Sequence, residues 1–249
     1  MTDKKYSLPL SLLKKTNDAF GHIRNSLPHR CILCHQQTPF FKNYLCATCR
    51  ADLPYPEFLC LGCATELPNE TKFCGHCLTT LNSHSLITAC DYQTPIKELI
   101  SSLKYKKNYS AAAELALHLS HRVCQYIDLG YIEQPQLLIP VPLHRYRQIK
   151  RGFNQAELIA LHLGRLLGIP VANNCTRVLA TPAQSHLNSQ QRRHNLDRAF
   201  KLNSPILANN IALIDDVYTT GATMRELSQT IEHSQKITIQ YWCIARTLI

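Results

Sequence analysis

The sequence lacks any long apolar run. Its first 29 residues carry lysines at positions 4, 5, 14 and 15, and the proline at position 9 interrupts the apolar residues between them. A secretory signal peptide needs an apolar core of about 7–15 residues, and a membrane-spanning helix needs about 20. We therefore expect neither a signal peptide nor a spanning helix, and the cytoplasm is the expected compartment.

Acidic residues are scarce as well. The 249 residues include 17 Asp and Glu but 27 Lys and Arg, which gives a formal net charge of +10 when the histidines are neutral. Such an excess favours anionic partners, phosphates or nucleic acid, because the summed positive charge attracts anions to the surface. The charge by itself does not distinguish these two kinds of partner.

Cysteine, in contrast, is abundant. Eight of the twelve cysteines form four Cys-x-x-Cys pairs, and 11, 10 and 10 residues separate each pair from the next. The pairs are Cys31/Cys34, Cys46/Cys49, Cys60/Cys63 and Cys74/Cys77. Structural zinc is held by four ligands in a tetrahedron, and thiolates at this spacing are typical ligands. The pairs therefore predict zinc, at one or two sites, that folds a segment with too little apolar mass to fold alone.

The spacing leaves the ligand pairing open. Two sequential ribbons would join the first pair to the second, whereas an interleaved arrangement would join the first to the third. His29, His35 and His76 are close enough to replace a cysteine, although eight thiolates already fill two sites. A disulfide framework is the main alternative, but disulfides seldom persist in the cytoplasm. Iron–sulfur ligation is less favoured because its cysteines are usually less regularly spaced.

Strands and helices alternate from residue 85 onward. Apolar segments predict strands at residues 86–92, 137–141 and 211–214, and alternation of Ile237, Ile239, Tyr241 and Cys243 on one face predicts a strand at 236–246. Amphipathic periodicity predicts helices at residues 95–103, 109–127 and 154–167 and another after residue 221. This order predicts an α/β fold with a mainly parallel sheet flanked by helices. Four unpaired cysteines, Cys90, Cys124, Cys175 and Cys243, are expected in its core.

We expect three parts in the chain. Residues 1–28 would form an N-terminal extension, residues 29–80 a small double zinc-ribbon module, and residues 85–249 the α/β domain.

The most informative stretch is residues 211–223, Ile-Ala-Leu-Ile-Asp-Asp-Val-Tyr-Thr-Thr-Gly-Ala-Thr. Its four apolar residues predict a buried strand that stops at Asp215 and Asp216, where ligands of open α/β sheets bind. Paired carboxylates there are suited to bind either a cation or the vicinal hydroxyls of a ribose. The hydroxyl-rich turn then opens a helix, whose free N–H groups bind anions. A capped surface turn is the alternative, but caps do not need two acids and three threonines.

Two basic segments accompany this stretch. Residues 143–155 contain Arg145, Arg147 and Arg151 and no acid, which predicts a loop that binds a polyanion such as pyrophosphate. A solvated basic turn is the alternative. Residues 184–198, with Arg192 and Arg193, have few large apolar side chains and are expected to form an exposed loop that closes over a ligand.

Residues 211–223 resemble the 5-phosphoribosyl-1-pyrophosphate (PRPP) motif of type I phosphoribosyltransferases. Further segments, in order after the cysteine pairs, resemble the ComF family over about residues 28–246. They are Leu-Lys-Tyr at 103–105, Ile-Pro-Val-Pro-Leu at 139–143, Arg-Gly-Phe-Asn-Gln at 151–155, Gln184 and Arg-Arg-His-Asn at 192–195. Typical members have Val where this chain has Ile214, a conservative difference, so the phosphoribosyl site should be intact.

The resemblance implies a zinc ribbon joined to a type I phosphoribosyltransferase-like domain, and an association with bacterial competence, the uptake and processing of transforming DNA. It implies PRPP or a related phosphosugar as ligand, accompanied by Mg²⁺, with competence proteins as partners. Asp215 and Asp216 would hold the ribose and are the candidate catalytic residues. The residues implied for the 5-phosphate are Thr219, Thr220, Gly221, Ala222 and Thr223, and those for pyrophosphate and lid are Arg145, Arg147, Arg151, Lys104, Arg192 and Arg193.

Two functions from different classes fit these observations. The first is a PRPP-dependent phosphoribosyltransferase, because no Ser-His-Asp or Cys-His arrangement requires another chemistry, and no motif identifies its acceptor. The alternative is a non-catalytic single-stranded DNA-binding factor, whose tyrosines would stack bases between basic side chains.

Overall fold

The computed structural model describes residues 29–38, 44–80, 84–179 and 199–247. The chain forms two compact units, whose boundary in the sequence lies between Ala51 and Asp52. The first unit pairs β1 (His29–Arg30) antiparallel with β2 (Gln37–Thr38) and adds helix α2 (Ala47–Ala51). This boundary falls inside the predicted cysteine module, between its second and third Cys pairs. The limits 1–28, 29–80 and 85–249 stay predictions.

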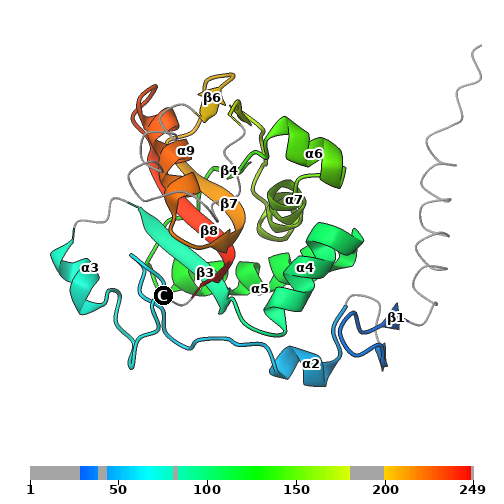
Figure 1. Cartoon of the computed structure of the whole chain (residues 1–249). Coiled ribbons are helices and arrows are strands. Elements are labelled where there is room, and N and C mark those ends of the chain that lie inside the picture. The colour runs from blue at the N-terminus through cyan, green and yellow to red at the C-terminus, as the bar shows by residue number, and fades with distance from the viewer. Residues whose placement is uncertain (1–28, 39–43, 81–83, 180–198, 248–249) are drawn as a thin grey trace, which may run out of the picture. The chain divides into compact units, whose positions relative to one another are not determined.

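The second unit is an α/β fold (Figure 1). Strands β3, β8, β7 and β4 are neighbours in this order, and every neighbouring pair is parallel. The elements in chain order are α3 (Gly75–Thr79), β3 (Ser85–Asp91), α4 (Ile96–Lys106), α5 (Tyr109–Asp128), β4 (Leu137–Pro140), α6 (Arg145–Arg151), α7 (Gln155–Leu167), β5 (Cys175–Arg177), β6 (Phe200–Leu202), β7 (Asn210–Tyr218), α9 (Ala222–Glu232) and β8 (Thr238–Arg246). The predicted parallel sheet flanked by helices is confirmed.

The central strand β7 is covered on both faces, which is why its sequence is apolar without alternation. Ile211 and Leu213 share a core cluster with Met224 and Leu227 of α9. The side chains between them point to the other face, because successive residues of a strand alternate, and α7 packs against β7. Trp242 of the neighbouring β8 is fully buried as well.

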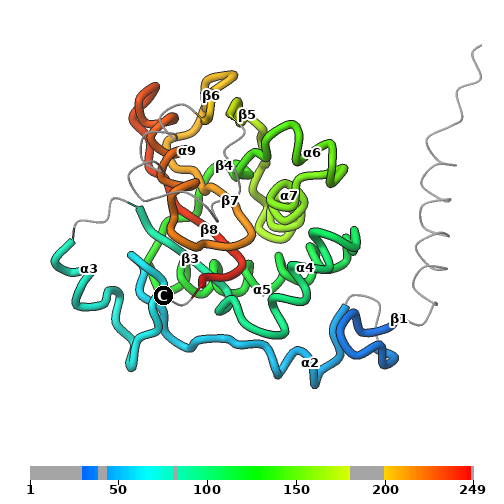
Figure 2. The backbone as a smooth tube through the Cα atoms, viewed as in Figure 1, coloured from blue at the N-terminus to red at the C-terminus, as the bar shows by residue number. Residues whose placement is uncertain are grey.

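The segment that contains Cys60, Cys63, Cys74 and Cys77 belongs to the α/β unit. The backbone N–H of Leu86, in β3, donates to Leu61 O at 2.7 Å. On α5, Arg122 Nη1 donates to Glu57 O at 2.9 Å, and the Tyr126 hydroxyl donates to Leu59 O at 3.2 Å. Figure 2 follows the backbone from this segment into β3. The ribbon thus has hydrogen bonds to one sheet strand and to one of the helices that cover the sheet.

The basic segment 143–155 is not the loop that its charge predicts, because Arg145–Arg151 forms helix α6. The ring nitrogen Nδ1 of His144 accepts the N–H of Tyr146 at 3.3 Å, and Gly152 ends the helix at a left-handed φ of 83°. Arg, Gln and Lys are good helix formers, so the same residues that give this segment its charge also favour a helix.

Two further expectations are wrong. The strand β7 does not stop at the acid pair, since Val217 and Tyr218 continue the ladder opposite Ala245 and Arg246 of β8. Cys124 lies exposed on α5, although Cys90, Cys175 and Cys243 are buried as expected. The antiparallel β5–β6 pair was not predicted, because its strands have three residues each.

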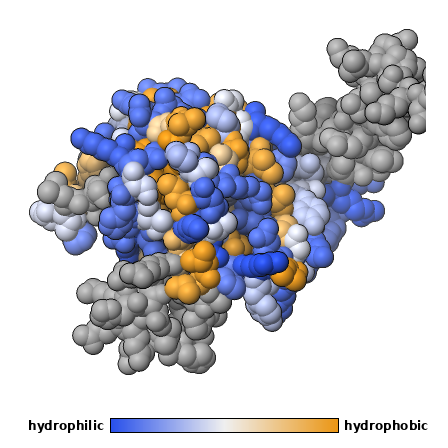
Figure 3. All heavy atoms as spheres, turned by 90° about the horizontal axis from the view of Figure 1, so that it is seen from above, coloured by the Kyte–Doolittle hydropathy of each residue, from blue (hydrophilic) through white to orange (hydrophobic). Residues whose placement is uncertain are grey.

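None of the helices in the described ranges is long and apolar enough to cross a membrane. The face in Figure 3 shows apolar side chains, in orange, interspersed with hydrophilic ones.

Candidate functional site

The eight paired cysteines gather into two groups of four. One group is Cys31, Cys34, Cys46 and Cys49, and the other is Cys60, Cys63, Cys74 and Cys77, with the ligand atoms of each group within 4.8 Å of one another. Sequential pairs therefore share a site, and the interleaved alternative is wrong. Both groups consist of cysteines alone, so among the described residues no histidine completes either set.

The sulfur geometry fits zinc. The Sγ atoms of Cys34 and Cys46 are 3.7 Å apart, and those of Cys63 and Cys74 are 3.8 Å apart. A tetrahedron with Zn–S bonds of about 2.3 Å places its ligands about 3.8 Å from one another. Backbone N–H groups of Cys49 and Cys77 also donate to Cys46 Sγ and Cys74 Sγ at 3.4 Å. Such bonds orient thiolates and offset their negative charge.

The acid pair lies near the carboxyl end of the central strand β7, where Asp216 is two residues before the last residue of the strand. Because neighbouring side chains of a strand leave it on opposite faces, Asp215 and Asp216 have different partners. Asp216 is mostly buried, and its Oδ2 is 2.6 Å from Lys104 Nζ near the end of α4. Asp215 Oδ1 accepts the backbone N–H of Asp216 at 2.8 Å. The structure therefore brings the predicted Lys104 to the acid pair.

The environment of Asp215 opposes its ionisation. Burial, and then the negative charge of Asp216, raise the pKa of Asp215 from 3.8 to about 7. The positive charges of Lys104 and Arg177 act in the opposite direction. The pair therefore holds less than two full negative charges near neutral pH, and a cation or a hydroxyl donor would favour its ionised form.

The hydroxyl-rich turn leads from β7 into α9. Gly221 caps the helix at a left-handed φ of 71°, and a Cβ there would overlap the ring and hydroxyl of Tyr218. Arg225 Nη2 donates to Thr220 O at 2.7 Å, which pins the turn from the helix side. The predicted residues Thr219, Thr220, Gly221, Ala222 and Thr223 thus surround the N-terminus of an 11-residue helix. Free N–H groups at such a terminus attract anions.

The predicted arginines of α6 divide between two environments. Arg145 lines a cavity of about 400 Å³ at the end of β4, together with Pro142, Asn154 and Arg177. Arg151 instead lies over the ring of Tyr105, 5.7 Å from its centroid, and donates to Gln155 Oε1 at 2.9 Å. Arg192 and Arg193 lie outside the described residues.

Arg177 is a site residue that the sequence did not indicate. It is the last residue of β5, its backbone forms an isolated parallel β-bridge with His144, just before α6, and it lines the same cavity as Arg145. Burial, followed by the charge of Arg147, lowers the pKa of its guanidinium, while Asp215 acts in the opposite direction. A single arginine in a three-residue strand carries no motif, so only the fold could place its charge where it acts on Asp215.

Metal analysis should find two zinc ions in each chain, because both cysteine groups have tetrahedral spacing. Cys34→Ser and Cys63→Ser should each lower the content to one. Cys124→Ser serves as the control and should leave two, since this exposed thiol lies outside both groups. One zinc or none in the unmodified chain would contradict the two-site assignment.

The raised pKa of Asp215 predicts that this residue's contribution to stability decreases as the pH rises. The folded chain retains a proton that the unfolded chain releases near 3.8, so the stabilisation is complete below that pH and is lost as the pH rises through about 7. Urea unfolding across this interval should show a smaller pH dependence for Asp215→Asn. Asp128→Asn, at an exposed carboxyl of α5, should keep the dependence of the unmodified protein; equal dependence in all three proteins would count against the raised pKa.

Comparison with known proteins agrees with the cysteine geometry. A family described as "Double zinc ribbon domain" matches residues 23–78, so the two groups of four cysteines are the structural zinc sites of a double ribbon. Among solved structures, a purine phosphoribosyltransferase from Pyrococcus horikoshii Ot3 aligns at 14% identity and a TM-score of 0.30, over 54% of this chain and 80% of that chain.

Three curated relatives match more of the chain than the ribbon family does. The DNA utilization protein YhgH of Salmonella typhimurium is 35% identical over 164 residues, which cover 66% of this chain and 72% of that protein. Competence protein ComFC of Bacillus subtilis is 31% identical over 53% of this chain and 52% of its own length. Competence protein F of Haemophilus influenzae is 34% identical over 226 residues, which cover 89% of this chain and 99% of that protein. The chain therefore belongs to the ComF family.

Proposed function

We propose that the α/β unit binds PRPP and transfers its ribose 5-phosphate group to an acceptor, with release of pyrophosphate. We further propose that this reaction contributes to competence, the uptake and processing of transforming DNA. The observation that carries the proposal is the arrangement of Lys104, Asp215 and Asp216 beside the N-terminus of α9. It offers, within one short stretch of β7 and α9, acceptors for ribose hydroxyls and donors for a phosphate.

The 5-phosphate would bind at the turn 219–223. The hydroxyls of Thr219 and Thr220 are exposed there, and the free N–H groups of α9 add donors and a partial positive charge. Gly221 allows the left-handed turn that leads the backbone from β7 into α9. Asp215 and Asp216 would then accept hydrogen bonds from the two ribose hydroxyls, and Lys104 would offset their mutual repulsion.

The pyrophosphate would occupy the cavity at the end of β4. Arg145 and Arg177 line it, and the guanidinium group of arginine matches phosphate oxygens in geometry and charge. In the transfer, the bond between the anomeric carbon and pyrophosphate breaks, its electron pair leaves with pyrophosphate, and the acceptor forms the new bond. Mg²⁺ bound with PRPP would supply further positive charge to the leaving group. The protein's part is therefore positioning and electrostatic stabilisation rather than nucleophilic attack.

Calorimetry should show binding of PRPP with Mg²⁺ to the zinc-loaded protein. Asp216→Asn should weaken it roughly 10- to 100-fold, because hydrogen bonds to a charged group contribute about 1.5–3 kcal/mol. Asp128→Asn, at an exposed carboxyl on α5, should bind like the unmodified chain. Absence of PRPP binding by the intact zinc-loaded protein would contradict this proposal.

A second candidate function, binding of single-stranded DNA, is favoured by the aromatic surface formed by Tyr105, Tyr109, Tyr146 and Phe153. The three tyrosines have exposed fractions of 73%, 52% and 69%. Arg151 lies over Tyr105, and Tyr109 contacts Phe153 edge-on at 5.2 Å between centroids. Exposed rings beside arginines and lysines provide stacking platforms for bases and charges for the backbone. This surface and the phosphosugar site can coexist.

If this surface binds DNA, Tyr105→Ala should weaken binding of an oligothymidylate about 5- to 100-fold, since base stacking contributes about 1–3 kcal/mol. Lys150→Ala, at an exposed lysine of α6, should weaken it less and reduce its salt dependence. Leu207→Ala, at a side chain that is 98% exposed, is the matched surface control. Negligible affinity for the oligonucleotide at low salt would exclude this candidate.

A further inference from the structure

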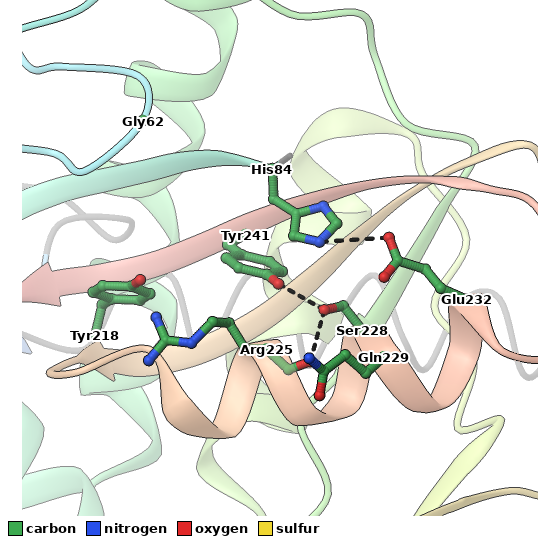
Figure 4. A pocket seen from close by; sticks show the side chains of 8 residues that line it. All are labelled: Gly62, His84, Tyr218, Arg225, Ser228, Gln229, Glu232 and Tyr241. Atoms are coloured by element: carbon green, nitrogen blue, oxygen red, sulfur yellow. Dashed lines mark hydrogen bonds and ion pairs between the residues drawn. The ribbon is translucent and has the colours of Figure 1, made fainter. Parts of the chain in front are cut away.

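The second zinc site lies close to the turn that we assign to the phosphate. Gly62, between Cys60 and Cys63, lines a cavity of about 170 Å³ together with Tyr218 and Arg225. Figure 4 shows Arg225 extending from α9 toward the ring of Tyr218, at the end of the cavity away from His84 and Glu232. The zinc ribbon and the phosphate turn are therefore neighbours, although about 150 residues separate them in the sequence.

A chain of hydrogen bonds connects a zinc ligand to the sheet. Cys63 Sγ is 3.1 Å from Thr65 Oγ1, and Arg246 Nη1 donates to the same oxygen at 2.8 Å. A cysteine that holds zinc is a thiolate and can only accept. The Thr65 hydroxyl would then donate to Cys63 and accept from Arg246, so that each group has a partner of the right kind. Such bonds behind a ligand orient it and couple it to the surrounding protein.

The same arginine adjoins the phosphate turn. Arg246 ends β8 directly opposite Tyr218, the last residue of β7, and the N–H of Thr247 donates to Tyr218 O at 3.0 Å. The ring of Tyr218 fills the space beside Gly221 that a side chain would otherwise occupy. A shift of the β8 end would therefore move Tyr218, and with it the support of the turn.

We propose that Thr65 and Arg246 are positioning residues that couple the second zinc site to the phosphate turn. Zinc at Cys60, Cys63, Cys74 and Cys77 holds Thr65, Thr65 holds Arg246, and Arg246 fixes the β8 end against which Tyr218 and the turn 219–221 are placed. The zinc of this ribbon thus has a role in ligand binding in addition to folding its own segment. The effect on PRPP rests on the function proposed above, whereas the coupling itself does not.

The test compares Thr65→Val with Thr65→Ser in the full-length, zinc-loaded chain. Val removes the hydroxyl and leaves every cysteine in place, whereas Ser restores the hydroxyl. Thr71→Val, at another exposed threonine of the same ribbon, is the matched control. Thr65→Val should keep two zinc ions, bind PRPP roughly 3- to 10-fold more weakly, as expected for one lost hydrogen bond, and exchange amide hydrogens faster at residues 216–224. Thr65→Ser and Thr71→Val should match the unmodified chain in all three measurements.

The hydrogen-exchange measurement separates this inference from the proposed function. If the unmodified chain fails to bind PRPP, the proposed function is lost, but faster exchange at residues 216–224 in Thr65→Val still supports the coupling. Unchanged exchange in that variant overturns it. If Thr65→Val loses zinc, Arg246→Gln is the deciding variant, because it removes the guanidinium that donates to Thr65 without substituting any residue of the ribbon. Unaltered exchange at residues 216–224 in Arg246→Gln then overturns the proposal.

Discussion

The ion pair between Lys104 and Asp216 is the interaction on which the candidate site depends. Two adjacent carboxylates at the end of a buried strand repel each other, and the 2.6 Å contact offsets that repulsion from one side. It also ties the last turns of α4 to the carboxyl-terminal part of β7. Because burial and the charge of Asp216 raise the pKa of Asp215 to about 7, the pair is poised to gain a cation or a hydroxyl-bearing ligand.

Zinc replaces apolar mass in the two ribbons, but the ribbons differ in what surrounds them. The first forms a compact unit with two-residue strands and a five-residue helix. The second hydrogen-bonds to β3, α5 and the end of β8. Its four cysteines therefore stabilise both their own loops and the parts of β3, α5 and β8 to which the ribbon is hydrogen-bonded. This difference explains why the boundary between compact units lies between the two zinc sites rather than after them.

Much of the fold could be predicted because its patterns are local. The run Ile211–Ile214 of β7 is continuously apolar, residues of β8 alternate on one face, and the regular Cys-x-x-Cys spacing indicated the metal sites. The misses have physical causes too. Arg145–Arg151 is basic enough to resemble a loop, yet its residues favour a helix. Val217 and Tyr218 follow two carboxylates, yet pairing with β8 keeps them in the strand.

The sequence alone determined the chemistry of this protein: eight thiolates at metal-binding spacing, and an acid pair followed by a hydroxyl-rich turn. Those features depend on residues close together in the chain. The tertiary structure decided which cysteine pairs share a site, that Lys104 contacts Asp216 while the charge of Arg177 acts on Asp215, and that the second ribbon adjoins the turn between β7 and α9. The cysteine pairs meet through the loops of their own ribbons. Lys104 and the second ribbon instead reach β7 from far away in the sequence, and the order and register of the parallel strands bring these segments together.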